Sequence, residues 1–211
     1  MLPDLSAAQA AELASAFLAD LFERLPGELA PAGIDVEVAW SLTPGEATPR
    51  QPVPAFVQRG RDLGERMLTA FAHTARPETE TVIVGADFPD LSAAAVSEAF
   101  AALEEGAELI LGPAVDGGFY LIALAPSARV EDLFAGIEWG SETVLARTLV
   151  NAERLGLSCR LLAPHADVDR FADLAPLAAR LDLPGAPACP RTRRALADCG
   201  VPTAAALGGL P

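Results

Sequence analysis

Residues 81–92 read Thr-Val-Ile-Val-Gly-Ala-Asp-Phe-Pro-Asp-Leu-Ser, a run of β-branched residues that gives way to turn-forming residues and a serine suited to begin a helix. Such a run is typical of a strand that is buried on both faces, as in a parallel sheet. In open α/β sheets, ligands bind at the carboxyl ends of strands. The residues directly after Val84 are therefore the first place to look for functional side chains, and Asp87 and Asp90 stand there.

Helical and strand patterns alternate along the rest of the chain. Ser6 and Gln9 form a capping box before a first helix, which we expect to stop at Pro26-Gly27. Further helices are expected at 62–75, 92–105, 141–155, 171–181 and 192–197, and strands at 34–38, 56–57, 81–85, 108–111, 119–124 and 158–162. This alternation predicts an α/β fold, a mostly parallel sheet with helices on both faces. We expect one domain over residues 1–182, then a Pro/Gly-rich linker and a short C-terminal helix over residues 183–211.

Composition excludes several classes of function. The 211 residues carry a formal net charge of −14 at pH 7, so we expect no nucleic acid partner, because a duplex carries about one negative charge every 1.7 Å. The chain has no lysine, which excludes lysine-dependent catalysis. No apolar run reaches the roughly 18 residues that a membrane span needs. Three cysteines without CxxC spacing favour free thiols in a reducing cytoplasm over a disulfide framework or a zinc site.

Asp87 and Asp90 allow two interpretations. A carboxylate on a rigid strand end is a natural ligand for Mg²⁺ or Mn²⁺, which are often held by one or two carboxylates together with substrate phosphates. Alternatively, either residue caps the following helix, since acidic residues favour helix starts. The capping interpretation fits Asp90 better than Asp87.

Residues 111–120 read Leu-Gly-Pro-Ala-Val-Asp-Gly-Gly-Phe-Tyr. Asp116-Gly117-Gly118 between two expected strands is compatible with a simple hairpin turn. The longer glycine-lined segment also allows the backbone to approach a ligand closely. In that case Asp116 would act as a base on an acceptor hydroxyl.

Residues 58–67 read Gln-Arg-Gly-Arg-Asp-Leu-Gly-Glu-Arg-Met and precede an expected helix. Glycines and arginines at a helix start are suited to hold an anionic phosphate. The stretch is not a Walker loop, because the Gly-Lys-Thr ending is absent. A solvated, charged helix start is the alternative.

Asp167-Val168-Asp169 follows the last expected strand, with Asp173 four residues later. Asp169 is well placed to join Asp87 around a cation, and capping of the helix that begins near Phe171 is the alternative. The two histidines, at positions 73 and 165, have no partner at metal or triad spacing, and we interpret both as structural or exposed.

Four patterns occur in order: Gln-x-Gly-x-Asp-Leu-Gly-Glu-Arg-Met, Gly-x-Asp-x-Pro-Asp-Leu, Gly-Pro-Ala-x-Asp-Gly-Gly-Phe-Tyr-Leu-Ile and Asp-Val-Asp-x-x-x-Asp-Leu. Together they resemble a bacterial GT-A-like glycosyltransferase family, long catalogued as a domain of unknown function and described in part as an arsenosugar-biosynthesis glycosyltransferase. The resemblance covers about Leu2 to Leu181. It implies a nucleotide-diphospho-sugar transferase (GT-A, Rossmann-like) fold. It also implies a metal-dependent enzyme that moves a sugar from a nucleotide-diphosphate donor to a small-molecule acceptor.

The resemblance also implies roles for single residues. Asp87 would bind the metal that holds the donor diphosphate, and Asp169 would be a second metal-binding or phosphate-orienting residue. Asp116 would be the catalytic residue that faces the acceptor. The implied binding residues are Gln58, Gly60, Leu63, Gly64 and Arg66 on the donor side, and Gly117 and Gly118 on the acceptor side.

One departure from the family concerns the start of the chain. Members typically open with a strand and a glycine-containing loop that ends in Lys-Thr-Arg-Leu, whereas this sequence begins at Met1-Leu2-Pro3. We therefore expect the first strand to be missing, either because the true start lies upstream or because the protein is a non-catalytic remnant. A nucleotidyltransferase that acts on a phosphorylated small molecule is a further alternative. The pattern predicts no particular oligomeric state.

Overall fold

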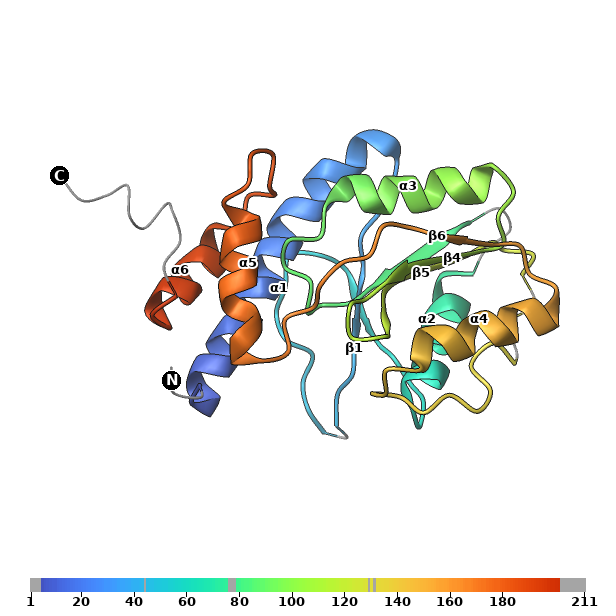
Figure 1. The fold of residues 1–211 in the computed structure, drawn as a ribbon, viewed down its shortest axis with the longest axis horizontal. Helices are drawn as coiled ribbons and strands as arrows, with labels where there is room; N and C mark the ends of the chain where they lie inside the picture. Colours follow the sequence, from blue (N-terminus) through green and yellow to red (C-terminus); the bar gives the residue numbers. More distant parts are fainter. Residues whose placement is uncertain (1–4, 44, 76–78, 129, 131, 202–211) are drawn as a thin grey trace. The chain divides into compact units, whose positions relative to one another are not determined.

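The computed structural model describes residues 5–43, 45–75, 79–128, 130 and 132–201 (Figure 1). The chain divides into two compact units. Unit 1 contains Met1–Asp35, Ala86–Ala93 and Asp167–Pro211, and unit 2 contains Val36–Gly85 and Ala94–Ala166. Each unit has its own hydrophobic core.

Unit 2 is built on a four-stranded sheet with the strand order β3-β5-β4-β6. The strands are β3 (Thr81–Val84), β4 (Leu109–Pro113), β5 (Phe119–Leu124) and β6 (Cys159–Leu161). β5 runs antiparallel to both β3 and β4, whereas β4 and β6 are parallel. Three of the four strands therefore share one direction, and the predicted α/β fold is confirmed.

Helices cover both faces of this sheet, as predicted. α2 (Leu63–Thr74) and α4 (Val144–Leu155) lie on one side, and α3 (Ala93–Glu104) lies on the other (Figure 1). Side chains alternate along a strand, so every second residue faces the same helices. The resulting core includes Met67, Leu109, Leu111, Ile122, Leu124 and Ala152.

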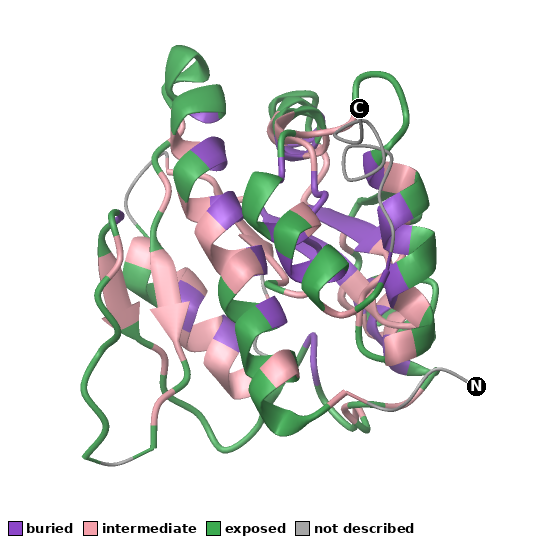
Figure 2. Cartoon of the chain, turned by 90° about the vertical axis from the view of Figure 1, so that its left-hand side faces the viewer, coloured by how far each residue is buried: buried purple, intermediate pink, exposed green. Residues whose placement is uncertain are grey.

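The second sheet of unit 2 is the parallel pair β1 (Val38–Trp40) and β2 (Ala55–Val57). Its residues are half-buried or exposed, in contrast to the largely buried β4 and β5 (Figure 2). Among the described residues, β3 pairs only with β5. The expectation that a first strand is missing stays a prediction.

The strand expected at 34–38 lies further along the chain, at Val38–Trp40. Gly33 closes a 3₁₀ turn with a φ of +72°, and the Ile34 N–H still donates to the carbonyl of Leu29. The chain is thus still completing the end of the helical segment at Ile34. The alternation of apolar residues from Ile34 misled the prediction, because it starts before the backbone becomes extended.

The secondary-structure elements in the described residues of unit 1 are all helices. It contains α1 (Ala7–Leu29), η1 (Ala30–Ala32), η2 (Phe171–Asp173), α5 (Leu174–Leu181) and α6 (Pro190–Asp198). Leu13 and Phe17 of α1 pack with Leu177 and Leu181 of α5 and with Leu196 of α6. The short helix in the C-terminal segment is therefore part of the same core as α1.

The start of α1 is as predicted, but its end is not. The Ser6 hydroxyl accepts the Gln9 N–H, and the Gln9 side chain accepts the Ser6 N–H, which confirms the capping box. The expected stop at Pro26 is wrong, because the helix continues to Leu29. Leu25 and Leu29 are both buried on one face. We attribute the extra turn to this burial, which offsets the hydrogen bond lost at the proline.

Asp20 on α1 fixes the start of α6. Its side chain is 1% exposed, and its two oxygens accept the backbone N–H groups of Arg191 (3.2 Å) and Thr192 (2.7 Å). These N–H groups lie in the first turn of α6 and have no partner within the helix itself. Asp20 therefore caps α6 from another helix.

Replacing Asp20 with alanine is expected to lower the free energy of unfolding by about 2 kcal/mol, because two buried donors lose their acceptor. Urea denaturation followed by circular dichroism measures this change. Glu23→Ala is the matched control, since Glu23 forms only an exposed ion pair with Arg191 (3.1 Å). That pair is worth well under about 1 kcal/mol. Equal losses in the two variants would contradict the capping role.

Candidate functional site

Asp87 lies in the segment that follows β3 in the sequence, and it lines a cavity of about 290 Å³ in unit 1. The side chain is half-buried. The backbone N–H of Val168 donates to the carbonyl of Asp87 at 3.1 Å. This bond joins the Asp87 segment to the Asp167–Asp169 segment, although the two are far apart in the sequence.

Asp169 lines the same cavity as Asp87. Apolar residues of α1 also line the cavity, among them Leu13 and Phe17. Among the described residues that line the cavity, Arg170 is the one basic residue. The cavity thus combines two predicted metal ligands with a largely apolar wall.

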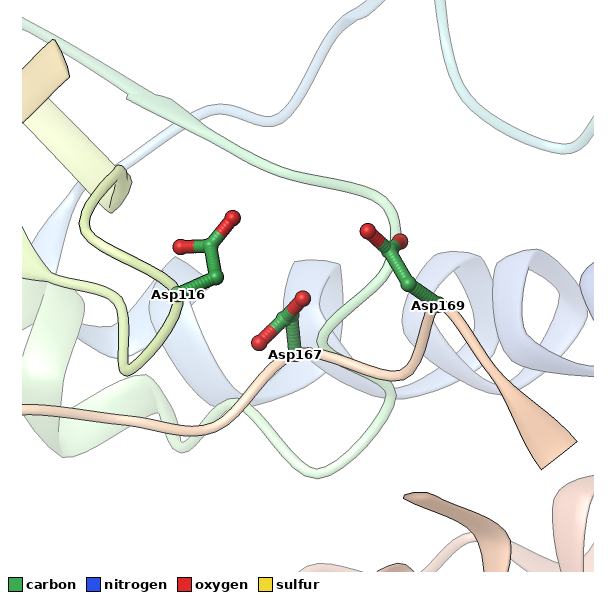
Figure 3. Close-up of side chains that lie close together, drawn as sticks. All are labelled: Asp116, Asp167 and Asp169. Atoms are coloured by element: carbon green, nitrogen blue, oxygen red, sulfur yellow. The ribbon is translucent and has the colours of Figure 1, made fainter. Parts of the chain in front are cut away.

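Asp167 is a functional candidate that we did not predict. Its carboxylate and that of Asp169 place oxygen atoms within 4.8 Å of each other. Figure 3 shows both side chains rising from the same short stretch of chain, and Asp116 on a separate turn. Residues two apart in an extended segment point to the same side, so the Asp-x-Asp spacing was a signal that should have included Asp167.

The side chain that accepts backbone hydrogen bonds at the start of η2 is that of Asp173, not that of Asp169. One oxygen of Asp173 accepts the N–H groups of Asp169 (3.1 Å) and Arg170 (2.7 Å). This observation fits the capping alternative for Asp173. It also fixes the backbone that carries the exposed Asp169 side chain.

Asp90 has a structural partner. Its buried carboxylate accepts two hydrogen bonds from the Arg180 guanidinium, from Nε at 2.7 Å and from Nη2 at 3.2 Å. A bidentate pair of this kind fixes the orientation of the carboxylate and also compensates its negative charge. Asp90 thus has a structural role as the partner of Arg180, and whether either aspartate caps the following helix stays a prediction.

In unit 2, Asp116, Gly117 and Gly118 form the turn between β4 and β5. The Gly118 N–H donates to Asp116 Oδ1 at 2.9 Å, and the Ala114 N–H donates to the Gly118 carbonyl at 3.0 Å. The antiparallel pairing of β4 with β5 shows that this is a hairpin. The role of Asp116 as a base and of the glycines in ligand binding stay predictions.

Packing within the chain itself requires two glycines of this stretch. A Cβ on Gly117 would overlap the backbone of Glu142, with the Glu142 Cα only 2.7 Å away. A Cβ on Gly112 would overlap the ring of Tyr120. Tyr120 is buried, as expected of a core residue, and donates from its hydroxyl to the Ala163 carbonyl at 3.3 Å. Burial, together with the charge of Glu98, raises the pKa of Tyr120.

The predicted donor-binding residues Gln58, Gly60, Leu63, Gly64 and Arg66 lie between β2 and the first turns of α2. Asp62 caps α2 by accepting the Glu65 N–H at 2.9 Å. Arg61 forms an ion pair with Glu65 and lowers the pKa of that carboxyl to about 2. These contacts fit the alternative of a charged helix start, and donor binding by this stretch stays a prediction.

The glycines of this stretch also have packing roles. Gly60 has a φ of +152°, and a Cβ there would lie 2.6 Å from the backbone nitrogen of Arg66. Arg66 in turn donates from Nε to the Gly60 carbonyl at 3.4 Å. A Cβ on Gly64 would lie 2.8 Å from Trp139 and 2.9 Å from Phe134. Gly64 is therefore a packing position under two aromatic side chains.

The histidines have structural surroundings in unit 2. His73 stacks on Phe56 at 3.8 Å between ring centroids and lies 3.5 Å from Glu37. His165 meets the ring of Tyr120 edge-on at 5.6 Å. Both observations agree with the interpretation of the two side chains as structural or exposed. No helix in the described part of the chain is long and apolar enough to cross a membrane.

Comparison with known proteins agrees with this geometry. A search of curated proteins finds no match. Among solved structures, the chain is similar to a candidate nucleotide-diphospho-sugar transferase from Desulfovibrio desulfuricans G20. The identity is 28%, the TM-score is 0.73, and the match covers 90% of this chain and 85% of that chain.

The similarity confirms the predicted nucleotide-diphospho-sugar transferase fold and the resemblance to GT-A-like glycosyltransferases. A family model described as "Uncharacterized protein conserved in bacteria (DUF2064)" matches residues 28–141, which is more than half of the chain. The chain therefore belongs to the bacterial family DUF2064.

Proposed function

We propose that this chain is a glycosyltransferase that moves a sugar from a nucleotide-diphosphate donor to a small-molecule acceptor. The observation that carries the proposal is that Asp87 and Asp169, which follow two different strands in the sequence, line one cavity in unit 1. The similarity to a candidate nucleotide-diphospho-sugar transferase supports the same reaction class. The proposal includes Mg²⁺ or Mn²⁺ as a cofactor.

The residues present fit such a cation. Mg²⁺ prefers oxygen ligands at about 2.1 Å, so two ligands on opposite sides of the ion are about 4.2 Å apart. The carboxylate oxygens of Asp167 and Asp169 lie within 4.8 Å of each other. A donor diphosphate would be repelled by carboxylates alone, so its binding at this cavity requires a cation. We propose Asp87 and Asp169, which line the same cavity, as ligands, with Asp167 as a further ligand beside Asp169.

A bound divalent cation neutralises the negative charge that develops on the departing nucleoside diphosphate. The chain's own residues would orient the two substrates. In the proposed reaction, the bond from the sugar C1 to the donor diphosphate breaks, and a bond from C1 to the acceptor oxygen forms. Asp116 would take the acceptor's hydroxyl proton at a carboxylate oxygen. Gln58, Gly60, Leu63, Gly64 and Arg66 would bind the donor, and Gly117 and Gly118 the acceptor.

Isothermal titration with UDP-sugars and GDP-sugars, with and without Mn²⁺, tests the proposal. We expect donor binding that depends on the metal. Donor binding that is equally strong without the metal, or no binding of any donor, would contradict it. The released product distinguishes the proposed activity from that of a nucleotidyltransferase. A glycosyltransferase releases a nucleoside diphosphate, whereas a nucleotidyltransferase releases pyrophosphate.

A further inference from the structure

Three side-chain donors, two of them buried and one partly exposed, hold the three consecutive residues Pro89, Asp90 and Leu91. The first is Arg24 on α1, whose side chain is 6% exposed. Its Nη2 donates to the Leu91 carbonyl at 2.6 Å and lies 3.5 Å from the Pro89 carbonyl. Arg24 thus spans the ends of the Pro89–Leu91 segment.

The other two donors are Arg180 on α5 and Cys189, which directly precedes α6. Arg180 holds Asp90 through the two hydrogen bonds described above. The Cys189 Sγ donates to the Pro89 carbonyl at 3.3 Å. Burial raises the pKa of this thiol to about 11, so it keeps its proton and remains a donor at neutral pH.

Backbone hydrogen bonds also hold this loop at Asp87 itself and at Phe88. The Val168 N–H donates to the Asp87 carbonyl, and the Leu91 N–H donates to the Phe88 carbonyl at 3.0 Å. The backbone is therefore fixed at Asp87 and again at residues 89–91. A carboxylate on a backbone fixed in this way has few positions available, which is what a metal ligand needs.

Stability alone is a poor explanation for this arrangement. Buried ion pairs cost desolvation free energy, and well-packed apolar residues in their place are often as stabilising. The core of unit 1 already contains fully buried leucines on α5 and α6, Leu177 and Leu196 among them. The donors instead converge on the Pro89–Leu91 segment, which begins two residues after the candidate ligand Asp87.

We propose that Arg24, Arg180 and Cys189 are positioning residues that hold the Pro89–Leu91 segment and thereby set the place of the Asp87 carboxylate. This inference rests on the proposed function, in which Asp87 binds the metal. None of the three donors is a metal ligand or a substrate contact in this arrangement.

The test compares Arg180→Gln with Arg193→Gln. Arg193 is a matched control because it also pairs with an acid, Asp182, at 2.5 Å, and its side chain is 23% exposed, against 25% for Arg180. Arg193 donates to Leu181 and Asp182 rather than to the Pro89–Leu91 segment. Each variant removes one ion pair within unit 1 and leaves its acid in place; the Asp90 side chain is 5% exposed and the Asp182 side chain 26%.

Hydrogen exchange of the metal-free protein is the first measurement. We expect Arg180→Gln to speed exchange in residues 86–91 about tenfold, and Arg193→Gln to change it less than about twofold. The second measurement is the affinity for Mn²⁺ alone, which we expect to fall about tenfold in Arg180→Gln and to stay unchanged in Arg193→Gln. Equal effects of the two variants on either measurement would overturn the inference.

Cys189 offers an independent comparison that leaves the ion pairs intact. Cys189→Ser retains a donor to the Pro89 carbonyl, whereas Cys189→Ala removes it. We expect faster exchange at residues 86–91 in the alanine variant and near-normal exchange in the serine variant. Equal exchange rates in the two variants would show that Cys189 is not a positioning residue.

Failure of the inference and failure of the proposed function give different results. If Asp87→Asn leaves Mn²⁺ affinity unchanged, the proposed function is wrong. If Asp87→Asn abolishes Mn²⁺ binding while Arg180→Gln leaves both the exchange rate and the Mn²⁺ affinity at wild-type values, the positioning inference is wrong and the proposed function stands.

Discussion

Replacing Gly117 with alanine is expected to lower the free energy of unfolding by about 3 kcal/mol, through backbone strain and overpacking together. Gly117 has a φ of +94°, a region that residues with a Cβ rarely adopt. The added Cβ would also overlap the Glu142 backbone. The clash has no easy relief, because the Gly117 carbonyl accepts the Leu145 N–H at 2.9 Å and so holds the turn against the start of α4.

The neighbouring Gly118 is the matched control for this substitution. A Cβ there would come no closer than 3.2 Å to the Asp116 carboxylate, a side chain with room to move, and Gly118 is not among the glycines with positive φ. We expect Gly118→Ala to cost less than about 1 kcal/mol. Urea denaturation of the two variants measures the difference. A Gly117→Ala variant as stable as Gly118→Ala would show that α4 does not hold the turn.

Asp87→Asn is expected to weaken Mn²⁺ binding about a hundredfold and to reduce any sugar transfer by at least as much. An amide removes the negative charge and leaves a single oxygen, which is a weaker ligand for a hard cation. The side chain is half-buried and keeps almost the same volume, so stability should change little. Titration of Mn²⁺, with the free ion followed by electron paramagnetic resonance, measures the affinity.

Asp198→Asn is the control for Asp87→Asn. It makes the same chemical change in the same unit, but Asp198 is exposed at the end of α6 and does not line the cavity. We expect its Mn²⁺ affinity and activity to equal those of the wild type. A similar loss of affinity in both variants would mean that net charge, rather than a ligand at position 87, governs binding.

The fold could be predicted where a single segment carries its own signal. The apolar runs at 81–84 and 119–124 marked two strands, and the capping box at Ser6 marked the start of α1. Pro26 failed as a stop signal because the burial of Leu25 and Leu29 favours another helical turn. The position of β5 between β3 and β4 depends on contacts between distant segments, which no local pattern encodes.

The candidate site could be predicted only in part, for the same reason. Asp87 and Asp169 stood out because each follows a strand, and they do line one cavity. The apolar wall that α1 contributes had no local signal. Arg24 and Arg180 look like ordinary helix residues and Cys189 like an ordinary linker residue. Their partners lie 67, 90 and 100 positions away along the chain.

The glycines show how one sequence pattern allows two explanations. Gly117 was expected to let a ligand approach, and the structure shows that it also lets the chain approach itself at Glu142. The same holds for Gly64 beneath Trp139. Sequence alone does not separate these two uses of a missing side chain, because both need the same space.

Unit 1 is assembled from three separate pieces of sequence, and this division determines when it can form during synthesis. The Asp20 carboxylate meets Thr192, which is 172 positions away. α1 is translated before α5 and α6, so Leu13 and Phe17 lie on a helix face whose packing partners are made about 160 residues later. All residues of unit 2 have been translated once Ala166 is made. We therefore expect unit 2 to fold before α5 and α6 are available to pack against α1. A ribosome stalled shortly before Pro190 would therefore present an exposed apolar helix to chaperones.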